Sequence, residues 1–270
     1  MTERKRIACF FTGGYTEVNA MKVYLSKVNG NVDYIQLCPV GTRKSRLSIK
    51  TRSTIAAEQS GLTGPSLIDF VLTQIKDEKY HFSDEQYDAI LIEDDKDNRF
   101  LSKLQDGTAD IDIAEWQTHK QNVTNSIHAF YPGIPVLFIY AAPEIEAWFL
   151  ADWNNSFAKV YKTERILSTT LNETFSIRFH QHINNHIVTT RYKNALESYG
   201  YFGGTYRKLS EEIQKALGDN DFLKDQPCHQ PVHYSKRTHG ELMLEEIDPE
   251  KVCQVCGTFF REGYLGLAQL

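Results

Sequence analysis

The pattern that most constrains the fold of this chain is a short apolar run followed by a segment of helical character. Apolar runs occupy residues 6–12, 32–38, 87–93 and 135–140. Segments with apolar residues at helical spacing, or with helix-start signals, occupy residues 16–28, 66–78, 113–130 and 144–153. The alternation of strands with helices is typical of a largely parallel sheet. The sequence therefore predicts an α/β fold in which helices flank a mostly parallel sheet.

The chain is expected to have an N-terminal α/β part and a C-terminal extension. The strand and helix pattern ends near residue 165, so we predict a domain over residues 1–165 and a helical or irregular extension over residues 166–270. In the extension, residues 194–199 and 206–217 are expected to be helical, whereas residues 219–237 are polar and rich in Cys, His and Pro.

Composition and charge exclude several classes of protein. The longest apolar stretch, residues 134–140, is far too short to span a bilayer, and the N-terminus lacks the apolar core of a signal peptide, so we expect a cytoplasmic protein. The five cysteines are then expected to stay reduced or to bind metal. A net charge of −5 gives no global basic field, so any nucleic-acid partner must be bound locally.

Acidic residues follow three of the four predicted strands. After the first, third and fourth strands these residues are Glu17, Asp94, Asp95, Asp97, Glu144 and Glu146. If the three strands are neighbours, the carboxylates converge at the sheet edge where open α/β folds bind ligands. Mutually repelling carboxylates need a cation, and such hard oxygen ligands suit Mg²⁺ or Mn²⁺. Helix caps and solvated loop ends are the alternative interpretation of these acids.

Three segments together resemble a known family. They are Gly14-Tyr-Thr-Glu17, Asp95-Lys-Asp97 and residues 142–152, which read Ala-Pro-Glu-Ile-Glu-Ala-Trp-Phe-Leu-Ala-Asp. In these segments the chain is similar to the Toprim-like domain of unknown function 4276 family. That family is related to the Toprim domains of overcoming-lysogenization-defect nucleases and is often found among bacterial phage-defence genes. The resemblance covers roughly residues 5–155, and a weaker one continues at Tyr234, Lys236, Cys253 and Phe259.

The resemblance implies a Toprim-like, Rossmannoid sheet and a Mg²⁺ or Mn²⁺ site for phosphodiester cleavage or transfer. It implies that Asp95 and Asp97 are metal ligands and that Glu17 matches the second glutamate of a Glu-Gly-x-x-Glu motif. Glu146 would be an added ligand or an outer anchor. The predicted catalytic residues are these four; the predicted metal set adds Asp94 and Glu144, and Lys236 is a candidate basic catalytic residue.

One position departs from the family, because Gly13 stands where the first glutamate of the motif is expected. Our first hypothesis is a metal-dependent nuclease of Toprim type, the effector of a phage-defence system. The alternative is a non-catalytic or degenerate subunit that binds a nucleotide, a nucleic acid or a partner ATPase. A third hypothesis is an enzyme acting on a small phosphorylated substrate. Walker A and Gly-x-Ser-x-Gly motifs do not occur in the sequence, which argues against an autonomous ATPase and a serine hydrolase.

A basic segment follows the second predicted strand, on the same expected edge of the sheet. Its positive residues are Arg43, Lys44, Arg46, Lys50 and Arg52. Lysine and arginine at such a place neutralise nucleic-acid phosphates without reading bases. A solvated loop is the alternative interpretation.

The C-terminal extension contains residues of a kind that bind zinc. Cys253 and Cys256 form a Cys-x-x-Cys pair, and the candidates for the remaining ligands are Cys228, His229, His233 and His239. The spacing is irregular, so a structural zinc site and buried packing cysteines both remain open.

Overall fold

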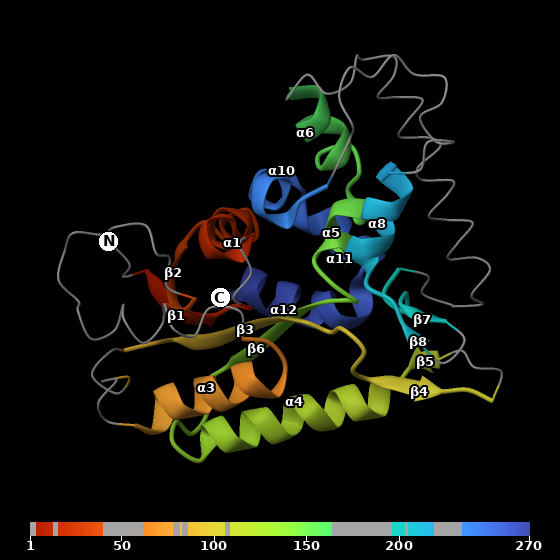
Figure 1. Ribbon diagram of the computed structural model, residues 1–270. Helices are drawn as coiled ribbons and strands as arrows, with labels where there is room; N and C mark the ends of the chain where they lie inside the picture. Colours follow the sequence, from red (N-terminus) through yellow and green to blue (C-terminus); the bar gives the residue numbers. More distant parts are fainter. Residues whose placement is uncertain are drawn as a thin grey trace.

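A four-stranded parallel sheet forms the centre of the protein in the computed structural model (Figure 1). The structure describes residues 4–12, 16–39, 62–77, 82, 86–105, 109–163, 196–202, 205–218 and 234–270. The strands lie in the order β2-β1-β3-β6 and are all parallel. Their bounds are Lys5–Phe10 for β1, Val32–Cys38 for β2, Ala89–Asp95 for β3 and Val136–Ala141 for β6. The predicted α/β fold with a parallel sheet is therefore confirmed.

Helices cover both faces of the sheet, as Figure 1 shows. On one face α3 (Pro65–Lys76) and α4 (Ile113–His128) pack on Ala8, Phe10 and Ile92. On the other face α1 (Glu17–Ser26) and α10 (Glu241–Glu246) pack on Ile7, Cys9 and Leu91. Alternate residues of one strand point to opposite faces, so each buried strand contributes to two apolar clusters. This explains why the strands read as continuous apolar runs.

Several predicted boundaries differ from the observed ones. Strand β3 continues through Asp95, because it pairs with β6 as far as the Asp95 and Ala141 partners. Helix α5 (Glu146–Ala151) covers a shorter range than the predicted residues 144–153. Residues 196–200 form turns rather than the expected helix.

The C-terminal segments complete the same core. They are a π-helix, η3 (Lys236–Gly240), followed by α10, α11 (Pro249–Val255) and α12 (Gly257–Gln269). Helix α12 packs along the edge strand β6. Its Phe259 belongs to the apolar cluster on one face of the sheet and Phe260 to the cluster on the other. The division at residue 165 stays a prediction, but these helices share one core with the sheet.

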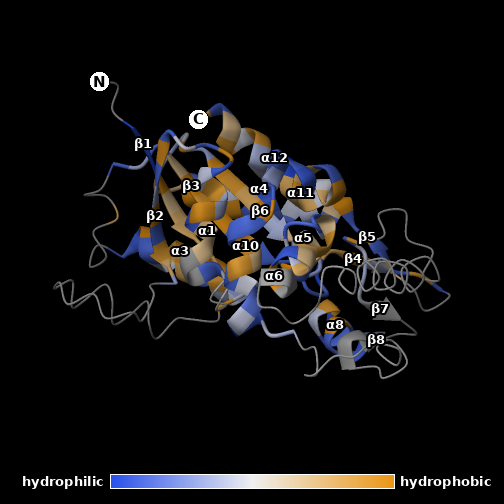
Figure 2. Cartoon of the chain, turned by 90° about the horizontal axis from the view of Figure 1, so that it is seen from above, coloured by the Kyte–Doolittle hydropathy of each residue, from blue (hydrophilic) through white to orange (hydrophobic). Residues whose placement is uncertain are grey.

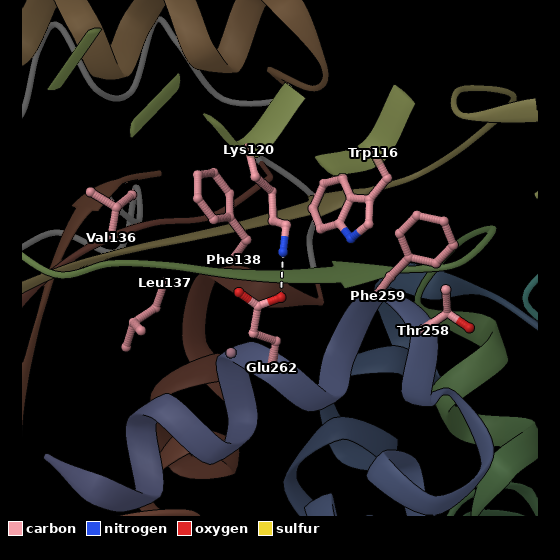
Figure 3. A pocket seen from close by; sticks show the side chains of 9 residues that line it. Trp116, Lys120, Val136, Leu137, Phe138, Thr258, Phe259 and Glu262 are labelled. Carbon is pink, nitrogen blue, oxygen red and sulfur yellow. Dashed lines mark hydrogen bonds and ion pairs between the residues drawn. The ribbon is translucent and has the colours of Figure 1, made fainter. Parts of the chain in front are cut away.

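A glycine allows α12 to approach β6 closely. A Cβ atom at Gly263 would lie 2.2 Å from the backbone oxygen of Phe138, so no other residue fits there without movement of the helix. Beside this contact, Lys120 of α4 and Glu262 of α12 form an ion pair across β6, at a small pocket (Figure 3). The helix therefore covers an edge that would otherwise offer unpaired backbone groups.

Shorter elements surround the carboxyl end of the sheet. They are the hairpin of β4 (Leu101–Lys103) and β5 (Ala109–Ile111), α6 (Phe157–Thr163), the hairpin of β7 (Tyr201–Phe202) and β8 (Thr205–Tyr206), and α8 (Leu209–Gly218). Figure 2 shows hydrophobic residues gathered in the strands and hydrophilic ones on the outer helix faces. In the part of the chain that the structure describes, no helix has the length and apolar character needed to cross a membrane.

Candidate functional site: a buried carboxylate cluster

Adjacent strands bring the predicted acids to one edge of the sheet. Because β1, β3 and β6 are neighbours and parallel, their carboxyl ends lie together. Glu17 begins α1 after β1, Asp95 ends β3, and Glu144 and Glu146 follow β6. We call these four residues the carboxylate cluster. Glu17, Glu144 and Glu146 are buried, and the Asp95 side chain is 16% exposed.

A lysine from the C-terminal part lies among these carboxylates. The Nζ atom of Lys236 is 3.1 Å from Glu146 Oε2, 3.8 Å from Glu144 Oε2 and 4.0 Å from Asp95 Oδ2. The lysine side chain is 35% exposed, so the cluster is open to solvent on the side of Lys236. The sequence singled out Lys236 only through the weaker part of the resemblance, and the structure places it at the centre of the site.

Hydrogen bonds fix one oxygen of each carboxylate that faces Lys236. Tyr234 donates its hydroxyl to Glu146 Oε1 at 2.9 Å, and the amide of Ile145 donates to Asp95 Oδ1 at 3.1 Å. The amide of Ser210 donates to Glu144 Oε2 at 3.3 Å. These donors come from three different segments, so the positions of the acids depend on the tertiary structure.

The backbone that carries Lys236 is held against the start of α1. A Cβ atom at Gly240 would lie 2.2 Å from Thr16 Oγ1, so the π-helix approaches α1 closely at that glycine. The hydroxyl of Thr16 donates to the backbone oxygen of Lys236 at 3.4 Å. Thr16 is the N-cap residue of α1, but its hydroxyl makes no cap hydrogen bond and contacts the lysine segment instead. Glu17 does lie in the first turn, where the helix dipole favours a negative charge.

Burial of several acidic side chains close together raises their pKa values. Burial raises the pKa of Glu17 to about 7, although Lys236 opposes the rise. Burial also raises the pKa of Asp95 well above its ordinary value and raises that of Glu146. Burial lowers the pKa of Lys236, but the carboxylates of Glu146, Asp95, Glu144 and Glu17 outweigh it, so that the pKa lies well above the ordinary range. The lysine is therefore an ammonium at neutral pH.

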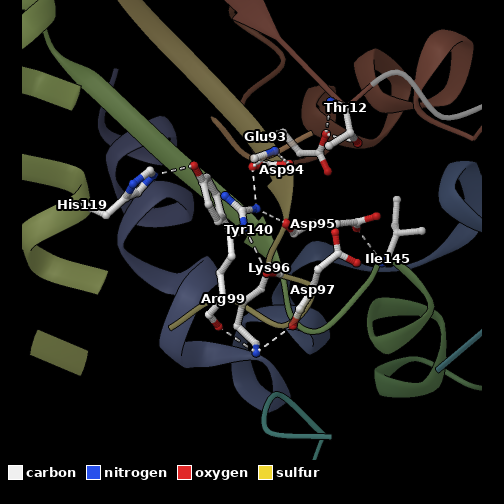
Figure 4. A network of polar contacts seen from close by, with 11 residues as sticks. Thr12, Glu93, Asp94, Asp95, Lys96, Asp97, Arg99, His119, Tyr140 and Ile145 are labelled. Atoms are coloured by element: carbon white, nitrogen blue, oxygen red, sulfur yellow. Dashed lines mark hydrogen bonds and ion pairs between the residues drawn. The ribbon is translucent and has the colours of Figure 1, made fainter. Parts of the chain in front are cut away.

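A further acid, Glu93, lies beside the cluster. It is on the same face of β3 as Asp95, and its Oε2 accepts hydrogen bonds from the amide and hydroxyl of Thr12 at 3.1 and 3.2 Å (Figure 4). Burial, reinforced by Glu17 and Asp95, raises its pKa well above the ordinary value. Sequence reasoning placed Glu93 inside the strand and did not choose it. The two-residue period of a strand ending at Asp95 is the signal that would have found it.

Asp94 lies apart from the carboxylate cluster, on the opposite face of β3. Its carboxylate accepts hydrogen bonds from the amide of Gly64 and forms an ion pair with Arg99 at 2.6 Å (Figure 4). The guanidinium of Arg99 also lies over the ring of Tyr140. Asp94 was predicted as a metal ligand, and in this structure its contacts instead join β3 to the start of α3 and to Arg99.

Asp97 lies in the loop after β3 and is partly exposed. Its φ angle of 50° is in the left-handed region, and its amide donates to the backbone oxygen of Pro143 at 2.8 Å. Burial raises its pKa, and Glu144 raises it further. Next to it, the fully buried Lys96 donates to the backbone oxygens of Asp97 and Arg99. The loop is thus held in a conformation that most residues rarely adopt.

The donor set of the cluster fits a hard divalent cation. Four carboxylates surround one ammonium, so full ionisation leaves a net charge of about −3 in a buried space. Among the described residues, Glu17 Oε2 and Glu144 Oε1 are buried and have no hydrogen-bond partner. As the side chains stand, no three Asp, Glu, His or Cys residues in the described ranges are arranged to hold one metal ion. The chemistry therefore suits Mg²⁺ or Mn²⁺, but the ammonium holds the central position.

The other predicted sites are described only in part. The basic residues Arg43, Lys44, Arg46, Lys50 and Arg52 lie outside the described residues, as do Gly13, Cys228, His229 and His233. Cys253 and Cys256 are buried in the apolar core, and burial raises the pKa of Cys256 well above its ordinary value. The Nδ1 atom of His239 accepts from the amide of Ser235 at 3.2 Å. These contacts are those of packing residues, and the zinc site stays a prediction.

The most distinctive segment of the sequence, residues 142–152, contributes residues to both the site and the core. Glu144 and Glu146 belong to the carboxylate cluster, whereas Trp148 is fully buried and stacks on Tyr24. Asp152 accepts from the amide of Asp248 at 2.9 Å and pairs with Lys251 at 3.0 Å. Its last acid therefore anchors α11 rather than the site.

Comparisons with protein-family models, with curated proteins and with solved structures found no match. The fold and the site define the class of protein. It is an α/β protein whose four-stranded parallel sheet is flanked by helices, consistent with a Rossmann-like fold, and whose strand ends carry a buried carboxylate cluster around a lysine.

Proposed function

We propose that this protein is a Mg²⁺- or Mn²⁺-dependent nuclease of Toprim type that cleaves phosphodiester bonds. The observation that carries the proposal is the convergence of Glu17, Asp95, Glu144 and Glu146 at the carboxyl end of the sheet. A buried group of four carboxylates has more negative charge than one lysine balances, and two of its oxygens have no partner among the described residues. A divalent cation would reduce this imbalance.

The residues that would hold the cation are those of the carboxylate cluster. A bound divalent cation would supply Lewis acidity and lower the pKa of a water molecule, and both effects favour phosphodiester hydrolysis. Tyr234 and the Ile145 amide already orient one oxygen each of Glu146 and Asp95, and these hydrogen bonds would hold the two carboxylates in place on binding. The partly exposed ammonium of Lys236 would attract a phosphate group to the cluster.

Cleavage assays test this proposal directly. Supercoiled plasmid, linear duplex, single-stranded DNA and RNA are incubated with the protein and Mg²⁺ or Mn²⁺. We expect metal-dependent cleavage of at least one substrate, a loss of at least about 100-fold in Asp95→Asn and Glu146→Gln, and no change in Asp69→Asn, which alters an exposed aspartate of α3. Equal cleavage by all variants would show that the carboxylate cluster takes no part in the reaction.

The central position of Lys236 favours a second candidate function. An ammonium between the carboxylates neutralises part of the charge that would otherwise bind metal. In this candidate the protein is a non-catalytic subunit of a defence system that binds a nucleotide, a nucleic acid or a partner ATPase. No Mn²⁺ binding at millimolar metal, together with stable association with such a partner, would favour it over the nuclease.

A further inference from the structure

Lys236 occupies the position that a metal ion in this site would need. Three carboxylate oxygens, one each from Asp95, Glu144 and Glu146, face its Nζ atom at 3.1 to 4.0 Å. Ligand oxygens lie about 2.1 Å from Mg²⁺. The same three oxygens therefore cannot bind a cation at their centre while the ammonium remains between them.

The lysine side chain has a route out of the cluster, whereas Glu144 and Glu146 do not. Its side chain is 35% exposed, while those of Glu144 and Glu146 are 1% and 0% exposed. The backbone of Lys236 is fixed by the contacts of Thr16 and Gly240. A movement of this residue is thus a rotation of a long, flexible side chain toward solvent, with the π-helix unchanged.

We infer that Lys236 is an exchangeable resident cation: a divalent metal ion displaces its ammonium from between Asp95, Glu144 and Glu146, and the released ammonium binds the phosphate of the substrate. This inference rests on the proposed metal site. It gives the lysine two positions. In one, the ammonium neutralises part of the charge of the metal-free cluster, and in the other it contributes a positive charge on the solvent side. Binding of metal and binding of phosphate are then coupled through one side chain.

Metal affinity gives the first test, with Mn²⁺ alone as the probe and calorimetric titration as the measurement. Lys236→Met removes the competing cation, so we expect Mn²⁺ to bind at least about tenfold more tightly than to the unchanged protein. The matched control is Lys251→Met, because Lys251 also pairs with a buried carboxylate, that of Asp152, away from the cluster. Unchanged or weaker Mn²⁺ binding by Lys236→Met would overturn the inference.

Lysine labelling of the unchanged protein separates displacement from simple repulsion between neighbouring charges. The protein is treated briefly with an amine-acylating reagent, with and without saturating Mn²⁺, and each lysine is quantified by mass spectrometry. Displacement predicts that Mn²⁺ increases labelling of Lys236 about threefold or more, given the change from pairing with carboxylates to solvent, and leaves Lys251 unchanged. Labelling of Lys236 that stays constant or falls when Mn²⁺ binds would refute displacement.

These outcomes are independent of the cleavage assay. If Mn²⁺ binds and releases Lys236 but no nucleic acid is cleaved, the exchange holds and the nuclease proposal fails. If Mn²⁺ binds and cleavage occurs without release of Lys236, the nuclease proposal holds and the exchange fails. If neither the unchanged protein nor Lys236→Met binds Mn²⁺, both fail.

Discussion

Replacement of Glu17 by glutamine is expected to stabilise the metal-free protein at alkaline pH. Glu17 is 2% exposed, and burial raises its pKa from the ordinary 4.5 to about 7. Below pH 4.5 the carboxyl group is protonated in both the folded and the unfolded chain, so its ionisation does not change the free energy of unfolding. Between pH 4.5 and 7 the unfolded chain releases this proton while the folded chain keeps it, so the free energy of unfolding falls.

The magnitude follows from the size of the pKa change. One pKa unit corresponds to about 1.4 kcal/mol, so a charged Glu17 costs the folded state about 3 kcal/mol at pH 8. Glutamine has nearly the same shape and does not ionise. We therefore expect Glu17→Gln to raise the free energy of unfolding by about 3 kcal/mol at pH 8 and by less than about 1 kcal/mol at pH 5.

Urea denaturation followed by tryptophan fluorescence at pH 5 and pH 8 measures this difference. The matched control is Glu115→Gln, because Glu115 also lies in the first turn of a helix, α4, but is exposed. The control is expected to change stability by less than about 0.5 kcal/mol at either pH. Saturating Mn²⁺ at pH 8 should stabilise the unchanged protein more than Glu17→Gln, because the variant lacks one negative charge. A destabilised Glu17→Gln protein at pH 8 without metal would refute the reasoning.

Two further predictions concern the framework of the site. Asp94→Ala leaves Arg99 without its buried partner, so we expect a loss of about 3 to 5 kcal/mol in the free energy of unfolding. Asp94→Ala should bind Mn²⁺ with the same affinity as the unchanged protein. A large loss of Mn²⁺ affinity would show instead that Asp94 is a metal ligand. Gly263→Ala places a methyl group against the backbone oxygen of Phe138, and urea denaturation should show a loss of about 2 kcal/mol or more. Gly266→Ala, which meets only the tip of a leucine side chain, should lose less, and equal losses would contradict the close approach of α12.

The fold could be predicted from the sequence because, in the sheet, the local pattern of apolar residues agrees with the tertiary structure. A strand buried on both faces needs a continuous apolar run, and the four predicted runs match β1, β2, β3 and β6 to within two residues at every end. The acids after these runs were expected to converge, and the neighbouring order of β1, β3 and β6 brings Glu17, Asp95, Glu144 and Glu146 to one edge. Parallel neighbours share their carboxyl ends, which is why strand positions alone could suggest the site.

The end of β3 shows where local reasoning failed. Three successive acids resemble a solvated loop, so the strand was expected to stop at Glu93. Pairing with β6 extends it through Asp95. Extension places Glu93 and Asp95 on the face of the carboxylate cluster and Asp94 on the other, where it pairs with Arg99. A strand boundary set by its partner therefore decided which acids belong to the site.

The sequence by itself determined the sheet and the edge at which its acids gather, because both follow from short-range patterns of apolar and charged residues. The tertiary structure alone decided what faces those acids. Lys236 and Tyr234 belong to a segment more than 80 residues after Glu146. The close contact of Gly240 with Thr16 holds this segment against the start of α1. No periodicity encodes such a contact, since it depends on how α12 and the segments before it pack back onto β6 and α1.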